Sequence, residues 1–468
     1  MDTEAVAPID TDALINRVPV GALQILVALL SGCALLVEGF NTSAIGYIAP
    51  QITRLWHVPN TTLGTILSAD MVGLLLGYLF ISPLSARFGH KRLLIACTAA
   101  FGAMTFLTIT ANGVPLLLVF RFLTGIGVGG AMPSAVALTG EYFPERMRSS
   151  SITLIYIGFS LGQIAAGVAS GLLLQPFGWR AVLATGGIGT LVLSLVFVFA
   201  LPESMEFLVN RSNGSKQAAA ILQRVAPDLR ISETTRITAG HHASSVRLRE
   251  LVQDGRATGT LLIWAGMFMN LMIYFFLQKW LTSLLVQSGL SQQVAITATT
   301  IGLAGGIAAA IIIGPLMDRY GPYAVVSGLF ALSAVSVVVM ARILVSPVPW
   351  LTVAVSFFVG FCLSGGQKAN NALSVFFYPT ALRGTGIGWS LGIGRFGGVI
   401  GPFMAGIMLA AGWSPGELFY AASVPMLLGA AAIAAMGIIY SRAVPAAREL
   451  VSAFASRHSA ASARRRQP

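Results

Sequence analysis

Charge is what this sequence has least of. Only 10% of its 468 residues are Asp, Glu, Lys or Arg, whereas 55% are hydrophobic. Because a soluble domain carries about 25% charged residues, a water-soluble globular fold is excluded. The 51 glycines agree with this, since small residues let helices pack closely inside a bilayer. The sequence therefore predicts an integral membrane protein.

Cysteine is also scarce, and its three residues all lie in apolar stretches. No CxxC or Cys/His spacing occurs, so we expect neither a disulfide nor a metal site. The acidic N-terminus lacks the basic segment that begins a cleavable signal peptide. The loops hold no nucleophile–base pair, so we do not expect an enzyme or a cofactor other than a coupling proton.

Long apolar runs are abundant, and twelve of them can cross a bilayer as helices. They are 21–49, 61–83, 93–111, 115–140, 150–174, 180–201, 258–287, 293–316, 323–343, 350–377, 384–411 and 416–440. The one long polar connection, 202–257, divides the chain into an N-terminal bundle at 21–201 and a C-terminal bundle at 258–440. Tails remain at 1–20 and 441–468, the second of them basic. We predict an all-α membrane protein of two six-helix bundles.

The positive charges are distributed unevenly between the two sides. Most of the 29 Lys and Arg lie in the even-numbered connections, the central loop and the tails. The opposite loops contain only Arg54, Arg180 and Arg342. By the positive-inside rule, both termini then lie in the cytoplasm. A net charge of +12 could indicate nucleic-acid binding, but topology accounts for it, and no nucleic-acid partner is expected.

A short motif recurs at matching places in the two halves. "GYLFISPLSARFGHKR" follows the second span and "GGIAAAIIIGPLMDRYGP" follows the eighth. Both contain a glycine turn with cations at a helix end, where they can meet helix C-termini or acidic groups and latch one conformation. The predicted gating residues are Arg87, Gly89, Lys91, Asp318, Arg319 and Gly321.

These repeats, "RFLTGIGVGG" in the fourth span and "LPES" after the sixth resemble the major facilitator superfamily. "EGFNTSAIGYIAP" and "GGQKANNALSVFFYPTALRG" are similar to its aromatic acid:proton symporter family. The resemblance implies the pseudo-symmetric major facilitator fold, with a cavity lined by helices 1, 4, 7 and 10. We also expect a monomer in the inner membrane. The chain departs from the family's D-G-F-D at Glu38 and Asn41, and from its first-loop Asp at Ala86.

Six ionisable residues lie within the spans away from their ends, and such residues mark a pathway or a pair. They are Glu38, Asp70, Arg121, Lys279, Lys368 and Arg395. The cations outnumber the acids, so a cavity containing them favours an anion.

Three of these residues are candidates for proton coupling. Burial favours the neutral form of a carboxyl group, so Glu38 can take up and release a proton. Its alternative role is that of an acid held permanently by a cation. Asp70 is a second candidate, although we expect it to form an ion pair with Arg395 between the bundles. Arg121 lies in the helix 4 motif and either assists proton movement or holds helices together.

The remaining polar and aromatic residues are candidates for substrate binding. Arg395 suits a carboxylate because its guanidinium can donate two parallel hydrogen bonds. Lys279 either binds the anion or extends to the membrane surface. Gln367, Asn370, Asn371 and Ser374 form a polar stripe on one helix face, with Lys368 at its edge. Candidates also include Asn41 and the aromatic residues Phe40, Tyr274, Trp280 and Trp389, of which Tyr274 and Trp389 are placed in the site.

The leading hypothesis is a proton-coupled importer of a small aromatic carboxylate, of the benzoate or hydroxybenzoate class or an aromatic dicarboxylate. Protonation of Glu38 would permit the loaded carrier to reorient between its two states. The alternatives are an importer of a non-aromatic organic anion, an efflux carrier of the same fold, or a receptor built on a carrier fold.

Overall fold

The structure is a computed structural model of the chain. It describes residues 9–211, 215–226, 237–238, 248–379 and 382–441. The predicted C-terminal tail therefore lies outside the described residues except for Ser441, as do parts of the N-terminal tail and of the central loop.

Twelve helices of the described chain are long and apolar enough to cross a membrane. Those of the N-terminal half are α2 (Ala22–Trp56), α3 (Asn60–Leu76), α5 (His90–Leu107), α6 (Val114–Tyr142), α7 (Glu145–Phe177) and α8 (Trp179–Ala200). The second span continues beyond α3 through the π-helix η1 (Gly77–Ile81), the 3-10 turn η2 (Ser82–Leu84) and α4 (Ser85–Phe88). The third ends in the 3-10 turn η3 (Thr108–Thr110).

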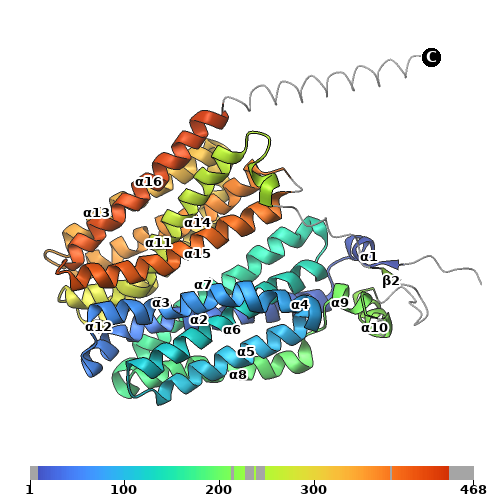
Figure 1. Cartoon of the computed structure of the whole chain (residues 1–468), viewed down its shortest axis with the longest axis horizontal. Coiled ribbons are helices and arrows are strands. Elements are labelled where there is room, and N and C mark those ends of the chain that lie inside the picture. The colour runs from blue at the N-terminus through green and yellow to red at the C-terminus, as the bar shows by residue number, and fades with distance from the viewer. Residues whose placement is uncertain (1–8, 212–214, 227–236, 239–247, 380–381, 442–468) are drawn as a thin grey trace, which may run out of the picture.

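The spans of the C-terminal half are α11 (Ala257–Gln287), α12 (Gln292–Tyr320), α13 (Pro322–Ile343), α14 (Pro349–Phe377), α15 (Arg383–Ala410) and α16 (Pro415–Ser441). The two halves form two bundles set side by side (Figure 1). Their packing repeats: α2 packs on α7 as α11 packs on α15, and α3 packs on α6 as α12 packs on α14. The predicted fold class is confirmed.

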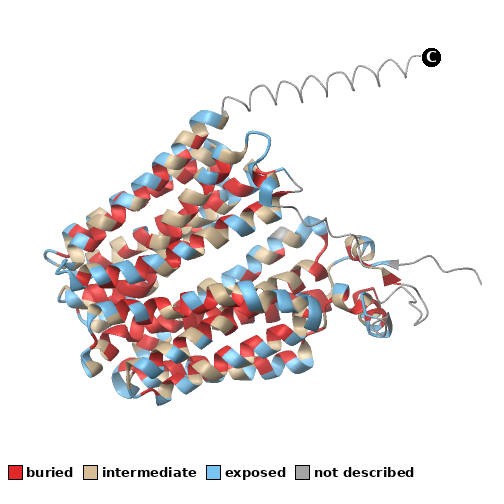
Figure 2. Cartoon of the chain, viewed as in Figure 1, coloured by how far each residue is buried: buried red, intermediate tan, exposed pale blue. Residues whose placement is uncertain are grey.

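Burial follows from this arrangement. Buried residues concentrate where helices of the bundles face one another, and exposed residues cover the outer faces (Figure 2). Many of the exposed side chains are large and apolar, such as Leu172, Phe199 and Ile311. An apolar outer surface is favourable in contact with the lipid of a bilayer and unfavourable in contact with water.

Short elements cover one end of the N-terminal bundle, which we call the loop end. They are α1 (Thr11–Arg17), α9 (Met205–Val209), α10 (Ser215–Val225) and a two-stranded parallel pair, β1 (Ile9–Asp10) with β2 (Ile237–Thr238). Asn16 at the end of α1 accepts a hydrogen bond from the Glu145 amide at the start of α7, at 2.7 Å. The opposite end, where α2 ends and α3 begins, is called the far end.

Candidate functional site

The two bundles share a large hydrophobic core at the far end and a small one formed by Met71 with Met267, Leu271 and Phe275, whereas the cores at the loop end are separate. The large core includes Ile48 and Leu67 from the first bundle with Leu284 and Ala405 from the second. Towards the loop end, one core contains residues of the N-terminal half and the central loop, and another only residues from 251 onward. The described residues therefore pack the bundles together at the far end.

Polar contacts between the bundles lie on the same side. Ser68 donates to the Val399 carbonyl at 3.1 Å, and the Tyr47 and Thr300 hydroxyls are 3.2 Å apart. A Cβ atom on Gly64 would press against Gly406, so α3 and α15 approach each other backbone to backbone. Only glycine permits that separation.

The strongest contact across this interface is an ion pair between α3 and α11. The Lys279 ammonium lies 2.6 Å from an Asp70 carboxylate oxygen, and it also donates to the Thr42 carbonyl at 2.8 Å. Lys279 is fully buried, so it does not extend to the membrane surface. The predicted interdomain pair of Asp70 is real, but its predicted partner Arg395 is wrong. Charged residues within spans are expected to avoid lipid, but only the registry between the bundles decides which cation meets Asp70.

Arg121 lies within the N-terminal bundle. Its guanidinium is fully buried and donates weakly to the Asn41 carbonyl at 3.5 Å and to the Thr105 and Thr124 hydroxyls at 3.4 Å. It also interacts electrostatically with Asp70. Arg121 is thus packed among α2, α5 and α6, in contrast to the expectation that one cavity contains all six ionisable residues.

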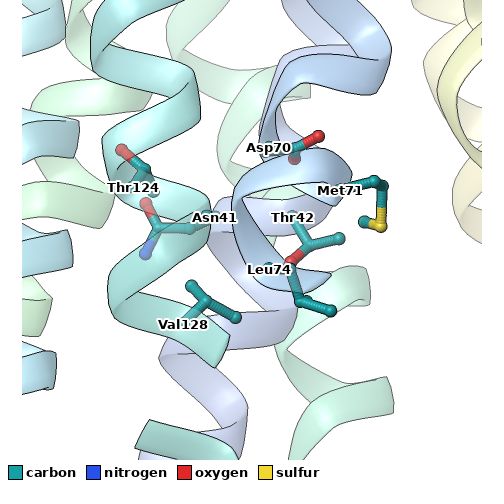
Figure 3. A pocket seen from close by; sticks show the side chains of 8 residues that line it. Asn41, Thr42, Asp70, Met71, Leu74, Thr124 and Val128 are labelled. Atoms are coloured by element: carbon teal, nitrogen blue, oxygen red, sulfur yellow. The ribbon is translucent and has the colours of Figure 1, made fainter. Parts of the chain in front are cut away.

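Asn41 has a similar place. Its side-chain amide donates to the Val37 carbonyl at 2.7 Å and to the Thr190 hydroxyl of α8 at 3.1 Å. Asn41 also borders a cavity of about 10 Å³ that Asp70 and Thr124 line as well (Figure 3). That is about the smallest space that holds one water molecule. The structure places Asn41 against its own bundle and not toward a substrate.

Glu38 lies on α2 where that helix meets the interior between the bundles. Its side chain is buried, and one carboxylate oxygen has no hydrogen-bond partner among the described residues. Three groups from other helices interact with it electrostatically: Arg395 of α15, Tyr78 of η1 and Tyr156 of α7. Tyr156 is partly buried, with 37% of its surface exposed, and it interacts electrostatically with both Arg395 and Glu38.

Arg395 is held by rings and not by an acid. Its guanidinium carbon lies 5.8 Å from the Tyr78 ring centre and 5.7 Å from that of Phe275. Its Nη2 atom donates to the Met132 sulfur at 3.9 Å. Within the described part of the chain Arg395 forms no ion pair. Stacking on rings stabilises a guanidinium by about 0.5–2 kcal/mol and leaves its N–H groups free to bind an anion.

A central cavity lies between α7 of one bundle and α11, α12 and α14 of the other. Tyr274, one of the predicted substrate-binding residues, lines it, and its hydroxyl donates to the Gln163 amide oxygen at 3.2 Å. Tyr274 also interacts electrostatically with Arg395. The cavity therefore lies beside Arg395 and the two rings that contact it, Tyr78 and Phe275.

The polar stripe of α14 is divided between two environments. Asn370 is fully buried and donates to the Ile263 carbonyl of α11 at 3.3 Å, and Ser374 donates to the Asn370 carbonyl at 3.1 Å. Gln367 and Asn371 are only half-buried. Lys368 donates to the Gly306 carbonyl at 2.6 Å and to Ser364 at 2.9 Å, so it lies between α14 and α12.

Trp389 is 43% exposed and stacks on Trp264 of α11, with ring centres 6.1 Å apart. The structure brings it into contact with none of the charged residues above. Trp280 donates to the Pro402 carbonyl at 2.9 Å and is part of the packing between α11 and α15.

The predicted gating loops both turn at a glycine in the left-handed region, with φ of +87° at Gly89 and +83° at Gly321. The backbone amide of Lys91 donates to the Glu203 carboxylate at 2.9 Å, so Glu203 of the "PES" stretch caps the start of α5. Arg87 and Arg319 each lie over the neighbouring ring, Phe88 and Tyr320. Among the described residues, neither these cations nor Asp318 form an ion pair in this conformation.

Sequence reasoning missed four residues that the structure brings into this region: Tyr78, Tyr156, Gln163 and Gln278. A signal was present. Tyr156, Ser160 and Gln163 are spaced i, i+4, i+7 on one face of α7, and Tyr274 and Gln278 are spaced i, i+4 on α11. The same helical spacing that identifies the polar stripe of α14 also identifies these polar faces of α7 and α11.

Known proteins resemble this chain along most of its length. The family model described as Major Facilitator Superfamily matches residues 32–309 and 263–467. The 4-hydroxybenzoate transporter PcaK of Pseudomonas aeruginosa is 35% identical over 437 residues, which cover 93% of this chain and 97% of that protein. The gallate transporter of Pseudomonas putida is 36% identical over 442 residues, covering 94% and 98%.

Solved structures resemble it in fold. The partially occluded inward-open conformation of the xylose transporter XylE from E. coli superposes with a TM-score of 0.67 at 15% identity. The match covers 88% of this chain and 97% of that chain.

Proposed function

This chain belongs to the major facilitator superfamily, and from that premise we propose that it is a proton-coupled importer of a small aromatic carboxylate working by alternating access. The family is one of transporters, not enzymes, as predicted. Relatives at 33–36% identity are named as 4-hydroxybenzoate and gallate transporters. Their substrates are aromatic rings that carry a carboxylate, and the benzoate transport protein of Acinetobacter baylyi is also similar, at 28%.

The surroundings of Arg395 are the observation that most strongly supports an aromatic carboxylate as the substrate. Arg395 is a guanidinium that forms no ion pair among the described residues, held between Tyr78 and Phe275 beside a mostly apolar cavity. A carboxylate can bind its free N–H groups while a ring occupies the apolar space. An aliphatic dicarboxylate would leave one charge in that apolar space without a partner.

Glu38 is the proposed proton carrier. Its carboxyl is buried near Arg395 and has an unpartnered oxygen. When the substrate anion neutralises Arg395, the charge that stabilises ionised Glu38 is lost, and protonation then becomes favourable. Substrate and proton would thus be taken up together. Asp70, already paired with Lys279, is assigned to holding the far end closed, and Arg121 to supporting Asp70 within its bundle.

Direction and orientation follow from charge. The positive-inside rule assigns the basic loop end to the cytoplasm of an inner (plasma) membrane. The conformation described, with the bundles joined at the far end, is then one that faces the cytoplasm and would release an imported substrate there. We expect the protein to act as a monomer, since each chain contains both bundles and the space between them.

Uptake by proteoliposomes tests the proposal. Wild-type protein should accumulate labelled 4-hydroxybenzoate only when an inward proton gradient is imposed, and a protonophore should abolish accumulation. Excess benzoate should compete, whereas excess succinate should not. Accumulation without a gradient would refute the coupling, and competition by succinate alone would refute the aromatic substrate class.

A further inference from the structure

The central cavity has apolar walls and a few polar groups. Leu277, Leu281, Leu303, Val359 and Leu363 supply the walls. Gly302 and Gly360 lie so close that a Cβ atom on Gly360 would meet the Gly302 carbonyl, which keeps α12 and α14 packed tightly on one side. Neither an acid nor a base is among the residues that line it. A neutral, flat and largely apolar group is the chemistry that fits these walls.

Three polar atoms on the cavity wall have no hydrogen-bond partner among the described residues. They are Nε2 of Gln163, Oε1 of Gln278 and Oγ of Ser356. The side chains are only 2%, 7% and 1% exposed. Leaving such an atom unpaired costs about 1–3 kcal/mol, so three at one cavity indicate a ligand that pairs with them.

The other atom of each amide is already engaged, which fixes how the two glutamines present themselves. Gln163 accepts from the Tyr274 hydroxyl through Oε1, and Gln278 donates to the Ser43 hydroxyl through Nε2 at 3.0 Å. One donor, Gln163 Nε2, and one acceptor, Gln278 Oε1, therefore remain without a partner on two residues that line the cavity. A hydroxyl group is the small neutral group that both accepts and donates.

The cations lie beside the cavity and not in its wall. Tyr274 connects it to Arg395, and Ser364 accepts from Lys368. Toward the far end, Gln278 follows Tyr274 by one helical turn, and Ser356 lies about 12 Å from Ser364 along α14, at 1.5 Å a residue. A bound aromatic acid would keep its carboxylate at the level of the cations and direct its ring toward the unpartnered atoms.

We propose that Gln163, Gln278 and Ser356 form a subsite that recognises a ring hydroxyl of the substrate, so that the protein selects hydroxylated benzoates over benzoate. This inference rests on the proposed function. The phenol O–H donates to Gln278 Oε1, and the phenol oxygen accepts from Gln163 Nε2 or Ser356 Oγ. Benzoate would leave all three atoms unpaired, which is the condition under which a site rejects an analogue that lacks a hydroxyl.

The test compares uptake of labelled 4-hydroxybenzoate and benzoate by the same proteoliposomes. Wild-type protein should show a higher kcat/KM for 4-hydroxybenzoate by about tenfold or more, the value of one buried hydrogen bond. Gln278→Leu and Ser356→Ala should each reduce that ratio several-fold. Because the ratio is taken within one preparation, loss of folded protein cannot produce the change.

Ser43→Ala tests the orientation of Gln278. It removes the Gln278–Ser43 hydrogen bond that fixes the amide but leaves the Gln278 acceptor in place, so the ratio should fall, by less than in Gln278→Leu. An equal ratio in wild type, or one that neither Gln278→Leu nor Ser356→Ala alters, would overturn the hydroxyl subsite. If wild type takes up neither acid, the proposed function itself fails.

Discussion

Asp70 and Lys279 come from different bundles, and each offsets the other's burial. A charge left alone in such a place is strongly unfavourable, whereas removing both together is often neutral. Lys279 is fully buried and Asp70 nearly so, with the two polar atoms 2.6 Å apart. The sequence favours an interior place for both, because charged residues inside spans seldom face lipid, although it left Lys279 the alternative of extending to the membrane surface. It does not show that they meet, since that depends on how two distant helices are aligned.

Neutralising one member of this pair should therefore cost more than replacing both. We expect Lys279→Met or Asp70→Leu to destabilise the folded protein by about 3–5 kcal/mol and the double variant to recover most of that loss. Thermal unfolding of the purified variants in detergent measures it. Losses that simply add in the double variant would show that the two residues do not act as a pair.

At the scale of single elements, local geometry positions the site residues. The π-helical turn η1 (Gly77–Ile81) interrupts the second span where Tyr78 lies over Arg395. Such turns are frequent at functional sites. The helices themselves could be predicted from length and apolarity, and the polar faces from spacing. The π-turn could not, because it changes the hydrogen bonding of a few residues without altering the apolar pattern.

The repeated glycine turns allow a matched comparison of two elements. Gly89 and Gly321 have almost the same φ, a conformation that costs other residues about 1–3 kcal/mol. A Cβ atom at Gly89 would also displace the Glu203 carboxylate that caps α5, whereas at Gly321 it meets nothing within 4 Å. Gly89→Ala should therefore lower the unfolding temperature more than Gly321→Ala. Equal decreases would contradict a role for Glu203 in stabilising this turn.

At the scale of the whole molecule, the distribution of the cores describes one state of a carrier. The bundles share a large core at the far end and a small one around Met71 and Phe275, whereas the cores nearest the loop end belong to one half of the chain each. The duplication and the twelve spans could be predicted from sequence because bilayer thickness and motif spacing determine them. The conformation could not, because the same residues must pack in at least two arrangements during transport.

The orientation of the whole molecule in the membrane can be tested with reporter fusions. Fusing green fluorescent protein after residue 441 should give a fluorescent cell, whereas alkaline phosphatase at the same place should be inactive, since the loop end is assigned to the cytoplasm. Alkaline phosphatase inserted at the far-end turn between α2 and α3, near His57, should be active. The reverse pattern would invert the topology and with it the proposed direction of transport.

Proton coupling depends most on Glu38, and Glu38→Gln in proteoliposomes tests it most directly. This variant keeps an uncharged side chain of the same shape but cannot release a proton. We predict that it exchanges external labelled 4-hydroxybenzoate for internal unlabelled substrate yet no longer accumulates it under an inward proton gradient. Gradient-driven accumulation at the wild-type rate would contradict Glu38 as the proton carrier.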